Sequence, residues 1–470
     1  MKKLFLTFGL FISLGVSAEV AVESVTISQQ WPWSTDVKVS YVLSGVTSKA
    51  NLSVEVYDGE KKLAGFAEVR KALKGSVYEL AEESGSFYID PTKLGLDVRT
   101  IQDFNVRLTA TKDDVLYKIF TLADGSCEDV TRGGLLSGRY GSVETDFAKV
   151  GEAFGVSGFN TSVDDVFIWT GVTNYPGART TKMVFRRIPA KGKDFTMGRA
   201  HENALADNEK NQIAHQVSFT NDFYMAVFEY TTGQAFTIRD TAVKNAKITV
   251  SPFFTNETCR LDRPLNCGYN QTRRLLQYWP GCTHEDSEPD FLGFVGQMRE
   301  KTGGVLFDLP TEAMWEFACR AGTTTDWNCG LNNSGNNAEK IQRAISRCQY
   351  NSQCSSSVLS KLDANGDADY GTAIVGSYAP NAWGLYDMHG NVNELCLDIY
   401  QQDISEFSGD DPVGPTAATY PTSATAVNRV RRGGSFYISQ NYNCSAYRSS
   451  ARSDTTSSYL GARFCIIVRE

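Results

Sequence analysis

The segment from Arg429 to Arg452, RVRRGGSFYISQNYNCSAYRSSAR, contains side chains of a type and spacing that could do chemistry. Ser435 follows a glycine pair, and glycine permits tight turns that other residues resist. Cys444 lies further along the same segment, and a cysteine thiolate can act as a nucleophile or as a metal ligand. Ser435 and Cys444 are therefore the candidate catalytic residues.

The same segment also has the composition of a binding surface. From residue 436 to residue 458 it is dominated by Tyr, Ser, Asn, Thr, Ala and Asp. Tyrosine supplies contact area at low entropic cost, and Ser and Asn supply adaptable hydrogen bonds. If this surface binds a protein or glycan, the expected ligand-binding residues are Trp383, Tyr437, Asn441, Tyr442, Tyr447 and Arg452.

Short strands, long loops and a few helices must position these residues. The segment 309–322, LPTEAMWEFACRAG, predicts a helix in which Thr311 is the N-cap and Gly322 ends the last turn. Apolar spacing predicts two more helices, within residues 288–303 and 337–348.

The N-terminal part has a different pattern. Residues 36–43, 51–58 and 104–110 alternate apolar and polar side chains, as strands with one buried face do. Several such strands in about 100 residues predict a β-sandwich of immunoglobulin-like type. We expect a sandwich domain over residues 19–125, a linker over 126–180 and a second domain over 181–470.

Residues 1–18 read as a secretory signal peptide, with Lys2 and Lys3 before an apolar run and small residues ending at Ala18. The alternative is an uncleaved N-terminal anchor. The expected location is therefore secreted, periplasmic or cell-envelope. The net charge of −8 with scattered signs argues against a nucleic-acid partner, and no later segment predicts a membrane span.

If the protein is exported, most of its 11 cysteines are expected to form disulfides, because the compartment is oxidising. Cys259 and Cys267, and likewise Cys348 and Cys354, are close enough in sequence to staple short loops. The odd count leaves at least one thiol free or paired with another chain. Connectivity does not follow from the sequence.

Four stretches of the C-terminal region resemble the formylglycine-generating enzyme family, also called the sulfatase-modifying factor domain. Their order and spacing match over about 290 residues. The resemblance implies an α+β fold of C-type-lectin-like kind with much loop. The stretches are 195–231, 309–322, 381–398, and 429–452 completed by 460–464.

The third stretch contains a Gly-Asn turn, GLYDMHGNVNEL, whose oxygens suit a hard cation such as calcium. Relatives bind calcium at this turn. Carried over, the metal ligands are Glu394 and the backbone oxygens of His389, Gly390 and Val392. The alternative is a turn stabilised by hydrogen bonds of Asn391 alone.

Active members of the family oxidise a sulfatase cysteine to formylglycine with oxygen and copper(I), held by two cysteines that follow the Gly-Gly-Ser. Copper(I) prefers such soft sulfur ligands. Here Ile438 stands near the place of the first cysteine, and Cys444 is one residue out of step with the second. Copper chemistry is therefore not expected, and Cys444 is predicted to form a disulfide with Cys396 or Cys465.

The sequence thus predicts an exported member of this family that binds a protein or glycan and holds a structural calcium ion. One alternative is a formylglycine-generating oxidase. Another is a lectin-fold receptor diversified by a retroelement, because the layout also resembles the variable segment of such receptors. The sequence does not define the ligand or the oligomeric state.

Overall fold

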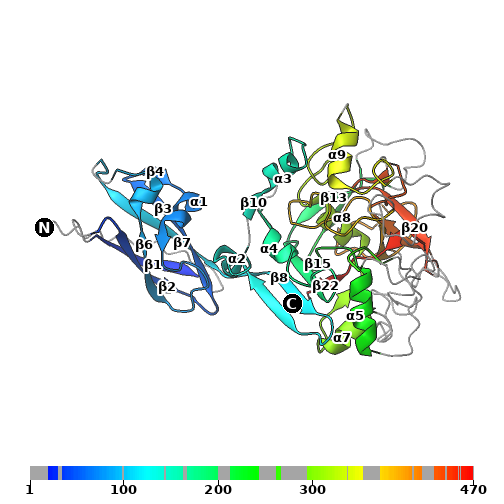
Figure 1. Ribbon diagram of the computed structural model, residues 1–470, viewed down its shortest axis with the longest axis horizontal. Helices are drawn as coiled ribbons and strands as arrows, with labels where there is room; N and C mark the ends of the chain where they lie inside the picture. Colours follow the sequence, from blue (N-terminus) through cyan, green and yellow to red (C-terminus); the bar gives the residue numbers. More distant parts are fainter. Residues whose placement is uncertain are drawn as a thin grey trace. The chain divides into compact units, whose positions relative to one another are not determined.

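The computed structural model describes the chain as two compact units (Figure 1). The first unit comprises residues 1–116 and 130–142, and the second comprises residues 117–129 and 143–470. The described residues are 20–29, 34–97, 100–141, 144–161, 167–199, 212–242, 261–265, 294–335, 337–352, 371–404, 407–414, 428–439, 442–453, 455 and 457–468.

The first unit consists of two antiparallel sheets that share one hydrophobic core. Inward-facing side chains alternate along the strands, for example Val39, Tyr41 and Leu43 opposite Leu52, Val54 and Val56, all buried in one cluster. The first sheet has the order β1 (Ala21–Gln29), β2 (Val37–Ser44), β6 (Ser84–Ile89), β5 (Leu73–Lys74). The second sheet has the order β4 (Lys61–Ala64), β3 (Ala50–Asp58), β7 (Phe104–Lys112). Short helical turns complete the unit: α1 (Phe66–Val69), η1 (Arg70–Ala72), η2 (Pro91–Leu94) and α2 (Arg132–Leu136).

The boundary between the units differs from the prediction. Residues 117–125 are predicted to lie in the N-terminal domain, but most of β8 (Val115–Thr121) belongs to the second unit, where it pairs with β12 (Lys182–Ile188). The segment 126–180 is more than a linker. It contains β9 (Cys127–Thr131), β10 (Glu144–Asp146), α3 (Phe147–Ala153), β11 (Phe167–Trp169) and α4 (Thr170–Thr173). Weak periodicity in this segment concealed these elements because they are short: β9 follows β8 at the edge of the largest sheet, and β10 pairs with β11 in a two-stranded sheet.

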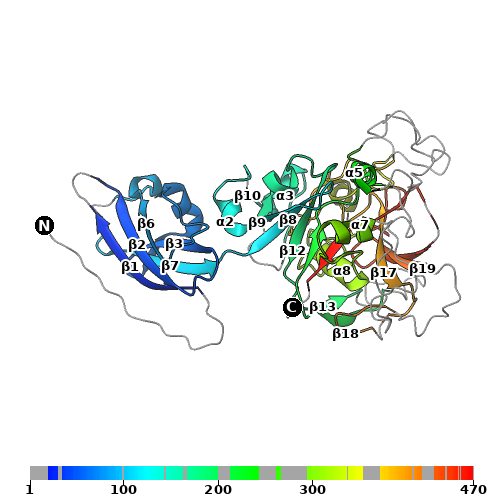
Figure 2. The ribbon, with the colours of Figure 1, turned by 90° about the horizontal axis from the view of Figure 1, so that it is seen from below.

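The second unit is mixed α+β, with short strands drawn from distant parts of the chain. Its largest sheet has the order β16 (Phe307–Asp308), β22 (Cys465–Ile467), β15 (Phe223–Ala226), β12, β8, β9. A three-stranded sheet, β13 (Asp194–Met197), β14 (His215–Ser218), β18 (Gly409–Asp410), lies in the same unit (Figure 2). The sheet that positions the candidate site has the order β20 (Arg448–Arg452), β19 (Asn428–Arg432), β17 (Asn393–Ile399), β21 (Leu460–Gly461).

Helices α5 (Thr232–Ala242) and α7 (Phe294–Lys301) lie side by side, and α8 (Glu312–Arg320) and α9 (Ala338–Ile345) complete the described helices of the unit (Figure 1). Helix α8 begins as predicted, because the Thr311 hydroxyl accepts a hydrogen bond from the Met314 amide at 3.2 Å. Ala321 is the C-cap, in the left-handed region at φ 44°, and Gly322 follows it at φ 87°. All nine residues of α8 are buried, so this helix is a central element around which the site is built.

Candidate functional site

The hairpin of β19 and β20 turns one face toward helix α8, and this inner face is dominated by ion pairs. Arg432 and Arg448 are directly opposite each other in the antiparallel register. Arg432 forms a buried ion pair with Glu316, and Arg448 holds Glu312 with two hydrogen bonds of 2.7 Å. Glu316 also accepts a hydrogen bond from Arg320 at 2.8 Å. Burial opposes ionisation of Glu316, but the two arginines outweigh it and hold its pKa below the usual value.

The turn that follows β19 requires glycine. Gly433 and Gly434 have φ values of 87° and 76°, and a Cβ on Gly434 would lie 1.8 Å from the Asn443 side-chain oxygen. That oxygen instead accepts a hydrogen bond from the Ser435 amide at 3.1 Å. The Ser435 hydroxyl is buried and accepts a hydrogen bond from the Tyr437 amide at 3.4 Å. Ser435 therefore has a structural role in the turn, whatever its chemical role.

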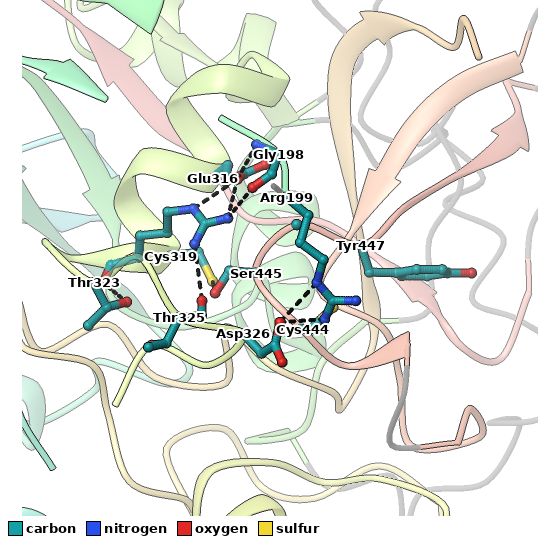
Figure 3. A network of polar contacts seen from close by, with 12 residues as sticks. Gly198, Arg199, Glu316, Cys319, Thr323, Thr325, Asp326, Cys444, Ser445 and Tyr447 are labelled. Carbon is teal, nitrogen blue, oxygen red and sulfur yellow. Dashed lines mark hydrogen bonds and ion pairs between the residues drawn. The ribbon is translucent and has the colours of Figure 1, made fainter. Parts of the chain in front are cut away.

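Cys444 lies beneath this turn, with 1% of its surface exposed. An Arg199 guanidinium nitrogen is 3.6 Å from its sulfur, and Arg199 is held in turn by Asp326 at 2.9 Å (Figure 3). Burial raises the pKa of the Cys444 thiol, which favours the protonated form. The site therefore disfavours the thiolate that nucleophilic or metal chemistry needs.

The predicted disulfide of Cys444 with Cys396 or Cys465 is wrong, because all three residues carry thiols. Cys348 is also a thiol, so its predicted short staple with Cys354 is not formed; Cys354 itself, with Cys259, Cys267 and Cys282, lies outside the described residues. Sequence spacing cannot show that Cys348, Cys396, Cys444 and Cys465 are each buried as separate thiols. The cysteines described as thiols are Cys127, Cys319, Cys329, Cys348, Cys396, Cys444 and Cys465.

The donor set does not fit the two-thiolate copper(I) site that the family implies. Ile438, near the place of the first cysteine, offers no side-chain donor, and its amide and carbonyl bond to Ser435 and Gln349. Cys319 was not predicted to lie near this site. Its sulfur is 3.8 Å from the hydroxyl of Ser445, the residue that follows Cys444. Burial raises the pKa of Cys319 to about 12, so it too is held as a thiol.

The Glu394 carboxylate of the predicted calcium turn is engaged by protein contacts. Both oxygens of Glu394 accept hydrogen bonds from Arg463, at 2.7 to 3.0 Å, and one also accepts the Trp315 indole N–H at 2.6 Å. A cation at Glu394 would have to displace the guanidinium. Within the described ranges, no group of three or more His, Cys, Asp or Glu side chains is arranged to hold a metal ion. The geometry thus gives calcium no support at Glu394.

The rest of the turn packs closely against neighbouring segments. A Cβ on Gly390 would lie 2.2 Å from the Arg347 carbonyl oxygen, which shows how closely the two chain segments approach. The Asn391 side chain donates to Glu229 at 2.6 Å, and the Val392 amide donates to the same carboxylate at 3.0 Å. Burial raises the pKa of Glu229 well above its usual value.

His389 of the same turn is also engaged by the protein. Its ring accepts a hydrogen bond from the Asn328 amide at 3.1 Å. Burial lowers the pKa of His389 to about 3, so the ring is neutral.

The outer face of the same hairpin presents tyrosines. Tyr442, 39% exposed, contacts the Tyr447 ring with a centroid distance of 5.0 Å. Tyr437 stacks on Tyr459 at 6.1 Å, and the Arg431 guanidinium lies over the Tyr459 ring at 5.5 Å. We call Arg431, Tyr437, Tyr442, Tyr447, Ser449 and Tyr459 the outer surface; all six are exposed or partly exposed.

Not every predicted ligand-binding residue belongs to this surface. Trp383 is 6% exposed and packs on Phe317 in the core, so it is not part of the outer surface. Arg452 is exposed, but it lies on the same side of β20 as Arg448, opposite the side of Ser449. It is therefore not part of the outer surface. Asn441 lies outside the described residues. Sequence analysis missed Arg431 and Tyr459; the alternation along NRVRR, which sends Arg431 and Arg432 to opposite faces, was the available signal for the first.

These features define a mixed α+β domain of loop-rich type, with buried arginine–carboxylate pairs beneath a glycine-pair turn. Residues 175–467 match the model of the sulfatase-modifying factor enzyme 1-like domain. The match covers more than half of the chain, and the chain belongs to this family.

Related proteins agree with this assignment. The chain is 34% identical over 166 residues to a formylglycine-generating enzyme of Thermomonospora curvata and 32% identical over 162 residues to that of Mus musculus. These matches cover 33% of this chain in both cases, and 48% and 38% of the relatives, so the chain spans less than half of their length. A serine/threonine-protein kinase pkn1 of Chlamydia pneumoniae is 37% identical over 127 residues, 27% of this chain and 15% of the kinase.

Among solved structures, PvdO from Pseudomonas aeruginosa is similar over 61% of this chain and 94% of its own, with 20% identity and a TM-score of 0.44. Treponema denticola variable protein 1 is similar over 61% of this chain and 95% of its own, with 21% identity and a TM-score of 0.39. Within the described residues, no helix has the length and apolar character needed to cross a bilayer.

Proposed function

We propose that the second unit is a recognition module that binds a protein or glycan ligand through the outer surface and does not carry out copper-dependent oxidation. One observation carries the proposal. Tyr442 is exposed and Tyr437 and Tyr447 are partly exposed around a glycine-framed turn, while the single thiol of that segment, Cys444, is buried and burial favours its protonated form. A ligand in solvent can therefore contact the tyrosine rings and hydroxyls, whereas the Cys444 sulfur is not accessible to it.

The alternative is a formylglycine-generating oxidase, which the names of the relatives favour. Against it stand Ile438 at a ligand position and thiols whose burial raises their pKa values. A second alternative, a lectin-fold receptor diversified by a retroelement, uses the same surface for binding and differs only in how its sequence varies.

The setting of this function follows from the remaining predictions. Export directed by residues 1–18 would place the chain in the cell envelope or outside the cell, facing an extracytoplasmic partner. The two-sheet first unit is proposed to be immunoglobulin-like, and the second unit C-type-lectin-like. Calcium, if bound, needs ligands other than Glu394.

The binding proposal is tested on glycan and random-peptide arrays with the purified full chain. The variants Tyr437→Ala and Tyr442→Ala should each weaken the array signal about tenfold, since exposed tyrosines are common binding hot spots. Tyr88→Ala is the matched control, because Tyr88 is similarly exposed, at 41%, but lies in the first unit. Equal signals from wild type and both surface variants would contradict the proposal.

The oxidase alternative has its own test. The chain, loaded with copper(I) and given oxygen and a Cys-x-Pro-x-Arg peptide, should yield no aldehyde by mass spectrometry. Formylglycine product would replace recognition with oxidation as the function.

A further inference from the structure

Arg431 differs from three other arginines of this region because no described carboxylate neutralises its charge. Arg432, Arg448 and Arg463 each form an ion pair with a buried glutamate. Arg431 forms no ion pair with any carboxylate in the described part of the chain. Its guanidinium donates a hydrogen bond to the Ser449 hydroxyl at 3.2 Å. Its Nε is buried and has no hydrogen-bond partner among the described residues.

The surroundings hold this guanidinium in place without neutralising it. The Tyr459 ring lies under it at 5.5 Å, and Tyr437 stacks on that ring with an interplanar angle of 12°. On the other side, Ser449 connects it to Tyr447, because the Ser449 side chain is hydrogen bonded to both. A cation that is positioned by π faces and hydroxyls keeps its electrostatic attraction for an external anion.

We propose that the outer surface recognises an acidic peptide segment of a protein partner, with Arg431 binding an Asp or Glu carboxylate. This proposal rests on the recognition function proposed above and adds the chemistry of its ligand. Arginine is the side chain whose planar fork matches a carboxylate, and such charge-assisted bonds are among the strongest hydrogen bonds in proteins.

A peptide fits this surface better than a sugar. The Tyr459 ring is engaged by both Arg431 and Tyr437, so what it offers a ligand is mainly its edge and hydroxyl. Tyrosine and serine are enriched in protein-binding paratopes, and tyrosine and arginine are common at the energetic centres of protein interfaces. The alternative, an anionic glycan bound by the same guanidinium, is an outcome of the test.

The test uses an array of random 12-residue peptides, probed with the purified full chain. The strongest binders are then resynthesised as matched pairs in which each Asp or Glu is replaced by Asn or Gln. We expect binders enriched in Asp and Glu, and at least one acidic position whose neutral replacement weakens binding about tenfold or more. Binding should also weaken as NaCl is raised.

Two variants assign the effect to Arg431. Arg431→Gln should remove the difference between the acidic peptide and its neutral partner, so that the two bind about equally. Arg431→Lys should restore part of the difference, because it keeps the charge but loses the fork. Arg343→Gln is the control, since Arg343 is exposed on α9 and pairs with Glu339. Melting curves of all variants establish that each is folded.

The outcomes are distinct from those of the recognition function itself. Peptide binding that is weakened by Tyr442→Ala but shows no acidic preference, or no response to Arg431→Gln, would overturn this proposal and leave recognition intact. Binding only to carboxylated or sulfated glycans would also overturn it, in favour of an anionic sugar. Formylglycine production without array binding would overturn both proposals.

Discussion

The two faces of the β19–β20 hairpin use the same residue type, arginine, in opposite ways. On the inner face, Arg432 and Arg448 are buried against Glu316 and Glu312 of helix α8. On the outer face, Arg431 lies among tyrosines and has no carboxylate partner among the described residues. A buried charge requires a partner because desolvation is costly, whereas a partly exposed charge can stay available. The inner arginines are therefore part of the packed core, whereas the guanidinium of Arg431 has the availability that the proposed recognition of a carboxylate requires.

The largest expected effect is on the inner face. Glu316→Ala removes the shared partner of Arg320 and Arg432 and leaves two buried guanidinium groups, so it should lower the free energy of unfolding by about 3–5 kcal/mol. Denaturant unfolding followed by tryptophan fluorescence reports on this unit, since Trp315 and Trp327 are buried there. Glu339→Ala, which breaks an exposed pair with Arg343, is the control and should change stability by less than about 0.5 kcal/mol. If the two variants lose similar amounts of unfolding free energy, the buried ion pairs are no more important for the fold than the exposed pair.

A pH-dependent contribution comes next, from Asp398 beside the inner face. Burial, together with nearby Glu312, raises the pKa of Asp398 to about 7. Between about pH 4 and pH 7 the folded chain keeps this proton and the unfolded chain loses it, so stability falls as pH rises. Asp398→Asn cannot ionise, and its loss of stability across that range should be smaller than that of wild type by about 2–4 kcal/mol.

Urea unfolding of wild type and Asp398→Asn at several pH values measures this difference. The slopes are compared rather than the absolute values, because the Asp398 oxygens accept hydrogen bonds from the Glu312 and Gly414 amides and asparagine loses one acceptor. Parallel curves would show that Asp398 is ionised in the folded chain throughout.

A smaller effect is expected at Cys444, between the two faces. Cys444→Ala should lower the free energy of unfolding by about 1 kcal/mol, since a buried sulfur is lost from a packed site. Binding to the arrays should be unchanged, because the thiol is not exposed to a ligand. Loss of binding with normal stability would mean that Cys444 belongs to the recognition surface after all.

The smallest effect is expected from calcium. Because Arg463 and Trp315 occupy both oxygens of Glu394, calcium or a chelator should shift the Tm by less than about 1 °C. Calorimetry of the full chain with calcium chloride and with EDTA gives the comparison. A clear rise of Tm in calcium would show that an ion binds elsewhere in the chain.

Local patterns predicted much of the fold. Alternation located β2, β3 and β7, and apolar spacing with a Thr311 cap located α8. These signals work because each depends on neighbours within one strand or helical turn. The boundary between the units differs from the prediction because β8 pairs with β12, about 60 residues later in the chain, which a local pattern does not show.

The site was predictable in part. The segment that contains Tyr437, Tyr442 and Tyr447 was identified by composition, and their exposure agrees with a surface role. The environment of Cys444 could not be predicted from composition, since it depends on Arg199 and Asp326, which are distant in sequence. Likewise, nothing local to Glu394 indicates that Arg463, 69 residues later, occupies its carboxylate.

Asn443 has a consequence for how this surface can change over generations. Its side chain holds the Ser435 amide at 3.1 Å and fills the space above Gly434, so the two ends of the segment 436–442 are fixed relative to each other. Substitutions at partly exposed or exposed positions such as Tyr437 and Tyr442 leave these two contacts of Asn443 intact, whereas insertions or deletions in the loop would strain them. The side chains of this loop can therefore change at constant length while the turn that frames them keeps its geometry.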